Sequence, residues 1–159
     1  MIFLTIGTQE PFDRLVKAMD EIAPYLDEHV VAQVSKTTYK AKNMETYEFL
    51  APTACEKYFS DAKLIVSHAG MGTIISALVN KKPLLVVPRL AKYGEHRNDH
   101  QLATAKAFEK QGYVHVVYDV QDLQEKLIDL LQQENLMGHQ LGKYASKELL
   151  TSIQEFMIS

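Results

Sequence analysis

The chain has 159 residues, of which 47% are apolar and 23% charged, an ordinary composition for a soluble globular domain. This length suits one domain, so we expect residues 1–159 to form a single unit. The formal net charge of −3 gives no reason to expect a nucleic acid as partner. The single cysteine, Cys55, excludes an internal disulfide, and its surroundings favour a small apolar residue over a nucleophile.

No apolar run approaches the ~20 residues needed to cross a bilayer. Residues 1–6 are apolar but lack the basic region and the length of a signal peptide. We therefore expect a cytoplasmic protein that meets a membrane only peripherally.

Short apolar runs alternate with longer helical patterns along the chain. The runs predict strands at residues 2–6, 30–34, 64–67, 84–87 and 113–117, with a weaker one at 47–50. Several runs are apolar at successive positions, which is typical of strands buried on both faces of a parallel sheet.

The helical patterns lie between these runs. The first follows Pro11, a favoured first-turn residue, and the next spans residues 73–79. A third covers residues 99–111 before Gly112, and others run from Asp119 or Asp122 through Leu131 and over residues 140–157. The alternation predicts an α/β fold, a Rossmann-like doubly wound parallel sheet with right-handed crossovers.

Three unusually polar loops follow the predicted strands, at residues 7–13, 68–73 and 88–101. Ligands of doubly wound sheets bind at the carboxyl ends of the strands. We therefore expect these three loops to converge on one binding site.

The second loop has the chemistry of a phosphate site. Gly70 and Gly72 permit positive φ and close approach to the backbone, and Thr73 opens a helix whose first N–H groups lack partners. A tight strand-to-helix turn explains the glycines equally well. The loop is neither a Walker P-loop nor a dinucleotide fingerprint. We predict that Gly70, Met71, Gly72 and Thr73 bind a diphosphate.

The ordered motifs 67–73 (SHAGMGT), 82–88 (KPLLVVP) and 98–101 (NDHQ) resemble the C-terminal, donor-binding domain of GT-B glycosyltransferases. The likeness is greatest to small catalytic subunits of two-component enzymes in glycosyltransferase family 28. These include the dolichol-pathway N-acetylglucosaminyltransferase subunit and bacterial exopolysaccharide and capsule subunits. Residues 3–9 and 94–101 look like the bacterial subunits, and the resemblance extends from residue 3 to about residue 117.

The resemblance implies a fold equivalent to the C-terminal lobe of a GT-B enzyme, with a UDP-sugar as donor substrate and no cofactor. It assigns the diphosphate to the loop of residues 70–73. It assigns the donor sugar to the polar segment after the next strand, whose side chains can both donate to and accept from sugar hydroxyls: Asn98, Asp99, His100 and Gln101. It also implies that the loop of Gly7, Thr8 and Gln9 faces the cleft and the acceptor-binding half.

One position departs from the pattern of the relatives. They often carry a glutamate a few residues into the helix after the HAG-type loop, where it binds the nucleotide ribose. This chain has Ser76 there, which forms a weaker hydrogen bond than a carboxylate. Glu95, from the neighbouring loop, is a candidate to replace the missing carboxylate.

Inverting transfer needs a base for the acceptor hydroxyl and stabilisation of the departing diphosphate. The helix N-terminal amides supply the second, with Arg89, Lys92 or Arg97 as candidate helpers. Three histidines near the loops are candidates for the base, principally His68 and His96 and also His100. Alternatively, His68 orients the loop by a hydrogen bond, the other two are polar loop or helix-start residues, and the base lies on another chain. His96 and His100 are four residues apart, but no further ligands complete a metal site, so we expect metal-independent transfer.

A GT-B enzyme has two lobes, and this chain is long enough for one. The resemblance implies a membrane-anchored, acceptor-binding subunit that recruits the chain to the cytoplasmic face. The complex is then a hexosyltransferase that acts on a polyprenyl-diphosphate-linked acceptor in exopolysaccharide or capsule biosynthesis. Residues 140–159 are expected to form a helix that docks on this partner or packs on its own sheet. The alternatives are a non-catalytic sugar-nucleotide-binding regulatory subunit and, less favoured by length, an epimerase or hydrolase.

Overall fold

The computed structural model describes residues 1–133 and 136, and its six strands form one sheet. The helix expected at residues 140–159 lies outside the described residues. The strands are β1 (Ile2–Thr5), β2 (Val30–Gln33), β3 (Glu45–Tyr47), β4 (Leu64–His68), β5 (Leu84–Val87) and β6 (His115–Val116). The helices are α1 (Asp13–Ile22), α2 (Pro52–Asp61), α3 (Met71–Val79), α4 (His100–Lys110) and α5 (Leu123–Leu131).

The strand order is β3-β2-β1-β4-β5-β6, and every neighbouring pair is parallel. The chain runs outward from β1 in one direction and then returns to place β4 on the other side of β1. A ligand crevice is expected where the order reverses, at the carboxyl ends of β1 and β4. In the register, Thr5 of β1 pairs with Gln33 of β2 and with Ser67 of β4, so these polar residues lie at one level near the carboxyl ends of the strands. The predicted Rossmann-like fold is confirmed.

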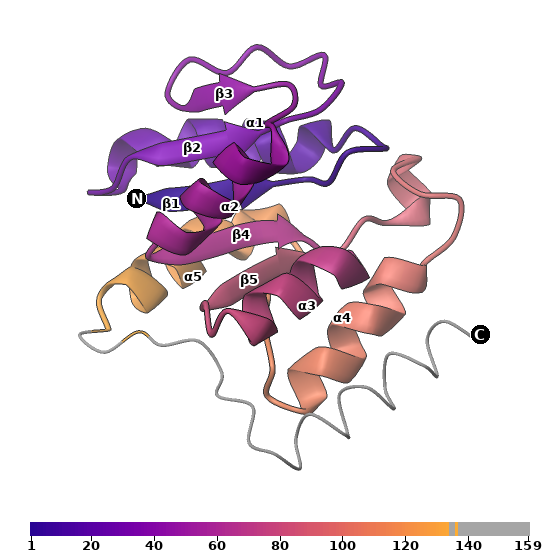
Figure 1. The fold of residues 1–159 in the computed structure, drawn as a ribbon. Coiled ribbons are helices and arrows are strands. Elements are labelled where there is room, and N and C mark those ends of the chain that lie inside the picture. Colours follow the sequence, from indigo (N-terminus) through magenta and orange to yellow (C-terminus); the bar gives the residue numbers. More distant parts are fainter. Residues whose placement is uncertain (134–135, 137–159) are drawn as a thin grey trace.

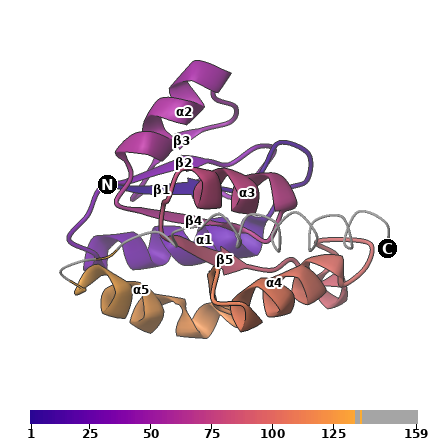
Figure 2. The same cartoon turned by 60° about the horizontal axis from the view of Figure 1, so that its bottom comes forward.

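Helices cover both faces of the sheet (Figure 1). One core cluster joins Ile2 and Leu4 of β1, and Ile6 directly after it, to α1 and α5. The other joins Phe3 to α2, α3 and α4. After the 60° turn of Figure 2, α2 and α3 lie on one side of the sheet and α1 and α5 on the other. This two-sided burial explains why β1, β2 and β5 are buried at every position.

Several element boundaries differ from the sequence-based expectation. The weak strand expected at residues 47–50 is observed at Glu45–Tyr47, and a ten-residue helix, Pro52–Asp61, follows that was not predicted. Only Phe59 of this helix is buried, so its apolar pattern is faint. Helix α3 begins at Met71, two residues earlier than expected. None of the described helices has the length and apolar character needed to cross a bilayer.

Candidate functional site

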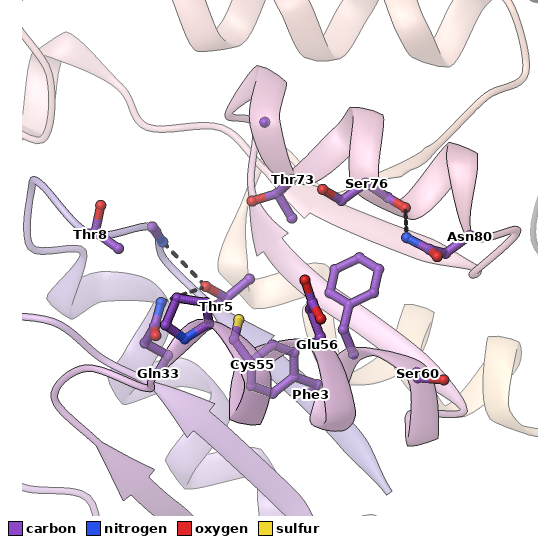
Figure 3. A pocket seen from close by; sticks show the side chains of 14 residues that line it. Phe3, Thr5, Thr8, Gln33, Cys55, Glu56, Ser60, Thr73, Ser76 and Asn80 are labelled. Atoms are coloured by element: carbon purple, nitrogen blue, oxygen red, sulfur yellow. Dashed lines mark hydrogen bonds between the residues drawn. The ribbon is translucent and has the colours of Figure 1, made fainter.

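A cavity of about 610 Å³ opens where the strand order reverses. Side chains from β1, the loop after it, β2, α2 and α3 line it (Figure 3). Its polar and small residues are Thr5, Gly7, Thr8, Gln33, Cys55, Glu56, Ser60, Gly72, Thr73, Ser76 and Asn80, and Phe3, Pro52 and Phe59 complete the wall. Five of the sequence-predicted site residues therefore meet in one cavity: Gly7, Thr8, Gly72, Thr73 and Ser76.

The N-terminus of α3 reaches this cavity. Gly70 is its N-cap and provides no side-chain hydrogen bond, and the first helical bond to it comes from the Ile74 amide. The amides of the first turn therefore have no acceptor within the helix, and together with the helix dipole they favour an anion. Gly72 and Thr73 line the cavity, while the Met71 side chain packs against the core. The geometry fits the predicted diphosphate position, which stays a prediction.

Glycine permits both positive φ and close approach of another group, and Gly70 uses only the second. Gly70 has φ of −85°, and among the described glycines only Gly7, Gly94 and Gly112 have positive φ. A Cβ on Gly70 would lie 2.2 Å from Cε1 of His68, and one on Gly7 would lie 3.0 Å from Nε2 of His68. The imidazole thus occupies the space that side chains at both glycines would fill.

Gly72 is different, because a Cβ there would meet no atom within 4 Å. It lies in the first turn of α3 and faces the cavity. A larger side chain at this position is compatible with the fold and would occupy the space beside the helix N-terminus.

Arg89 joins the three polar loops beneath this site. It follows β5 and is 3% exposed. Its Nη2 donates to the backbone carbonyls of Ile6 and Glu10, at 2.8 and 2.7 Å, and its Nη1 donates to Nδ1 of His68 at 2.8 Å. The backbone N–H of Arg89 donates to Oε1 of Gln101 at 3.1 Å. The guanidinium forms none of the ion pairs found among the described residues; backbone carbonyls accept from it, and the carboxylates of Glu10 and Glu95 stabilise its charge from a longer distance.

The same contacts define the state of His68. Arg89 and Nε2 of Gln101, 3.2 Å away, both offer N–H groups to Nδ1, so Nδ1 is an acceptor and the neutral ring carries its proton on Nε2. Burial, Arg89 and His96 lower the pKa of His68 to about 3. A catalytic base must take up a proton, and this environment opposes that. The geometry therefore argues against the predicted catalytic role of His68 and supports its orienting role.

The segment expected to bind the donor sugar lies beside the cavity rather than in its wall. Asn98 accepts from the His100 amide and Asp99 accepts from the Ala91 amide, both at 2.9 Å. Gln101 is 7% exposed and is bonded to Arg89 and His68 as described above. Sugar binding by Asn98, Asp99, His100 and Gln101 stays a prediction.

Glu95 does not reach the cavity. Its carboxylate accepts from Nε and Nη2 of Arg14, at 2.8 and 3.0 Å, and from the Leu90 amide at 3.0 Å. With its side chain 10% exposed, it is committed to stabilising the loop after β5. The expectation that Glu95 compensates for Ser76 is not supported by this geometry.

The remaining candidates are separate from the cavity wall. Gln9 is exposed in the loop after β1. His96 is half-buried, and its Nδ1 is a buried atom with no hydrogen-bond partner in the described structure. Over the residues that the structure describes, no three His, Cys, Asp or Glu side chains gather as metal ligands.

Helix α2 supplies residues that sequence reasoning missed. Cys55, Glu56 and Ser60 all line the cavity from this helix. A signal was present: Pro52 marks a helix start, and Cys55, Tyr58, Phe59 and Ala62 follow at helical spacing.

Comparisons with known proteins show a family match over nearly the whole chain. Residues 1–157 match the glycosyltransferase family 28 C-terminal domain. The UDP-N-acetylglucosamine transferase subunit ALG13 of Candida albicans is 32% identical over 87 residues, which cover 55% of this chain and 28% of that protein. The mouse (Mus musculus) subunit of the same name is 30% identical over 123 residues, covering 70% of this chain and 10% of that protein. The chain therefore spans less than a third of the length of these relatives.

Solved structures share the fold. The solution structure of ALG13 superposes with a TM-score of 0.62 at 20% identity, covering 94% of this chain and 93% of that one. The MurG structure from Acinetobacter baumannii superposes with a TM-score of 0.58 at 20% identity, covering 82% of this chain and 41% of that one. The family match over nearly the whole chain leads to one conclusion: this protein belongs to the glycosyltransferase family 28 C-terminal domain.

Proposed function

We propose that this chain is the donor-binding part of an inverting, metal-independent glycosyltransferase that uses a UDP-sugar. The observation that carries the proposal is the cavity of about 610 Å³ lined by β1, the loop after it and α2, which the first turn of α3 also lines. Names of the relatives support the donor class, because ALG13 of Candida albicans and a Bacillus cereus transferase 33% identical over 93 residues are both described as N-acetylglucosamine transferases.

The donor diphosphate is placed at the first turn of α3, beside Gly72 and Thr73. There the unpaired amides neutralise the negative charge that grows on the departing nucleoside diphosphate, without a metal ion. The buried guanidinium of Arg89 adds positive charge under the same loops. Gln101, which belongs to the segment proposed for the donor sugar, accepts from the Arg89 amide and so joins that segment to this site.

We further propose a membrane-anchored partner that binds a polyprenyl-diphosphate-linked acceptor, so that the complex acts at the cytoplasmic face in exopolysaccharide or capsule biosynthesis. The low pKa of His68, whose Nδ1 already accepts from Arg89, makes it a weak base and favours a base on that partner or at His96. The partner's contact with residues 140–159 stays part of this proposal.

Two measurements test the proposed function. Calorimetric titration of the full chain with UDP should detect binding, and absence of binding would refute the donor site. Transfer of a radiolabelled sugar from a panel of UDP-sugars to a polyprenyl-diphosphate-linked acceptor should require both the chain and its membrane partner. If UDP binds and the complex transfers nothing, the non-catalytic, regulatory sugar-nucleotide-binding subunit is the better description.

A further inference from the structure

The cavity has two chemically different ends. Gly72 and Thr73, at the first turn of α3, form the end that suits a diphosphate. Ser76, one turn further along the same helix, and Asn80, its C-cap, also line the cavity. Glu56 projects from α2 toward this part of α3, as Figure 3 shows.

Glu56 is the only charged side chain that the cavity wall contains among the described residues. Its other neighbours in the wall are neutral hydroxyls, amides and aromatic rings. A carboxylate has two oxygens that only accept hydrogen bonds, so it is matched to a ligand that presents two adjacent donors. The vicinal hydroxyls of a ribose are such a pair, and carboxylates commonly bind ribose hydroxyls beside helix-bound phosphates.

We propose that Glu56 binds the ribose hydroxyls of the nucleotide, opposite Ser76, and so selects a ribonucleotide donor. This inference rests on the proposed function, because it takes the diphosphate to lie at the N-terminus of α3. A nucleotide anchored there extends along α3 and brings its ribose between Ser76 and Glu56.

Two other groups were candidates for this contact. Glu95 is held by Arg14 and the Leu90 amide and does not line the cavity. Ser76 lines the cavity and offers one hydroxyl, while its carbonyl accepts from the Asn80 side chain at 2.7 Å. A hydroxyl forms a weaker bond to a ribose than a carboxylate does. Glu56 therefore provides from α2 the carboxylate that α3 lacks.

The structure also makes Glu56 a clean position to alter. Its side chain is exposed, and no hydrogen bond or ion pair joins it to another of the described residues. Glu56→Gln keeps the shape and removes the charge and one acceptor. Glu21→Gln is the matched control, because Glu21 is an exposed glutamate on α1, on the opposite face of the sheet.

The experiment is calorimetric titration of the full chain with UDP, 2′-deoxy-UDP and 2′,3′-dideoxy-UDP. The unaltered chain should bind UDP about ten- to a hundredfold more tightly than the dideoxy analogue, because only UDP can donate its ribose hydroxyls to the charged carboxylate of Glu56. In Glu56→Gln this preference should fall to within about threefold, with binding of the dideoxy analogue unchanged or tighter. Glu21→Gln should keep the full preference.

Failure of this inference is distinguishable from failure of the proposed function. If the unaltered chain binds UDP and its dideoxy analogue equally, or if Glu56→Gln keeps the preference for UDP, the role of Glu56 is refuted while the donor site stands. If the unaltered chain binds none of the three nucleotides, the donor site itself is refuted.

Discussion

Replacing Arg89 with methionine tests whether one buried guanidinium holds the site loops together. Methionine keeps much of the side-chain length and removes the charge and all five N–H donors. The change leaves the carbonyls of Ile6 and Glu10 and Nδ1 of His68 without the donor that they share, at distances of 2.7–2.8 Å. It also removes the guanidinium 5.1 Å from the centre of the Phe12 ring.

The size of the effect follows from these groups. Each buried acceptor left without a donor costs about 1–3 kcal/mol of folding stability. Part of this loss is offset because the variant no longer has to bury a charged guanidinium. We expect the free energy of unfolding to fall by about 3 kcal/mol. For a domain of this size that lowers Tm by roughly 10 °C, at about 3 °C per kcal/mol.

The assay is thermal and urea unfolding followed by circular dichroism. Arg97→Met is the matched control, because Arg97 is an exposed arginine in the same loop and its replacement should change stability by less than about 0.5 kcal/mol. A Tm for Arg89→Met equal to that of Arg97→Met would refute the reasoning. The ¹⁵N chemical shifts of the His68 ring add an independent readout. In the unaltered chain the ring proton should be on Nε2 alone, and in Arg89→Met, where Arg89 no longer donates to Nδ1, it should be shared between Nε2 and Nδ1.

Three further predictions follow from the same structure. Because the pKa of His68 is about 3 and its ordinary value is 6.5, the unfolded chain binds a proton between these pH values that the folded chain does not. The free energy of unfolding should therefore fall as pH decreases through this window, by about 1.4 kcal/mol per pH unit well below 6.5. In His68→Gln, the free energy of unfolding measured by urea titration should depend less steeply on pH. Gly72→Asp should fold, since its Cβ has free space, yet lose UDP binding by calorimetry because a negative charge lies at the helix N-terminus; unchanged affinity would contradict the diphosphate position. Asp20→Ala removes an acceptor of the Tyr39 hydroxyl and the Lys42 and Asn43 amides, so it should cost about 3 kcal/mol in chemical unfolding while leaving UDP affinity unchanged.

The amino-acid sequence by itself determines the architecture and the phosphate end of the site. Apolar runs at successive positions require burial on both faces, so a parallel sheet covered by helices on each side follows from hydrophobicity alone. The loop at residues 68–73 could be assigned to the carboxyl edge because strand–helix alternation leaves it nowhere else. These features depend on residues that are close in the chain, so they can be predicted from the sequence.

Only the tertiary structure decided how residues distant in the chain act on one another. Gly70 is needed because the imidazole of His68 fills the space beside it, and not because of its own φ angle. Arg89 contacts carbonyls about eighty residues earlier, and Glu95 is drawn to Arg14 by an ion pair that no spacing rule reveals. The weakly patterned α2 brings Glu56 to the cavity because Phe59 of the same helix packs against Phe3 of β1. Such contacts depend on crossover geometry and packing, which are properties of the folded chain as a whole.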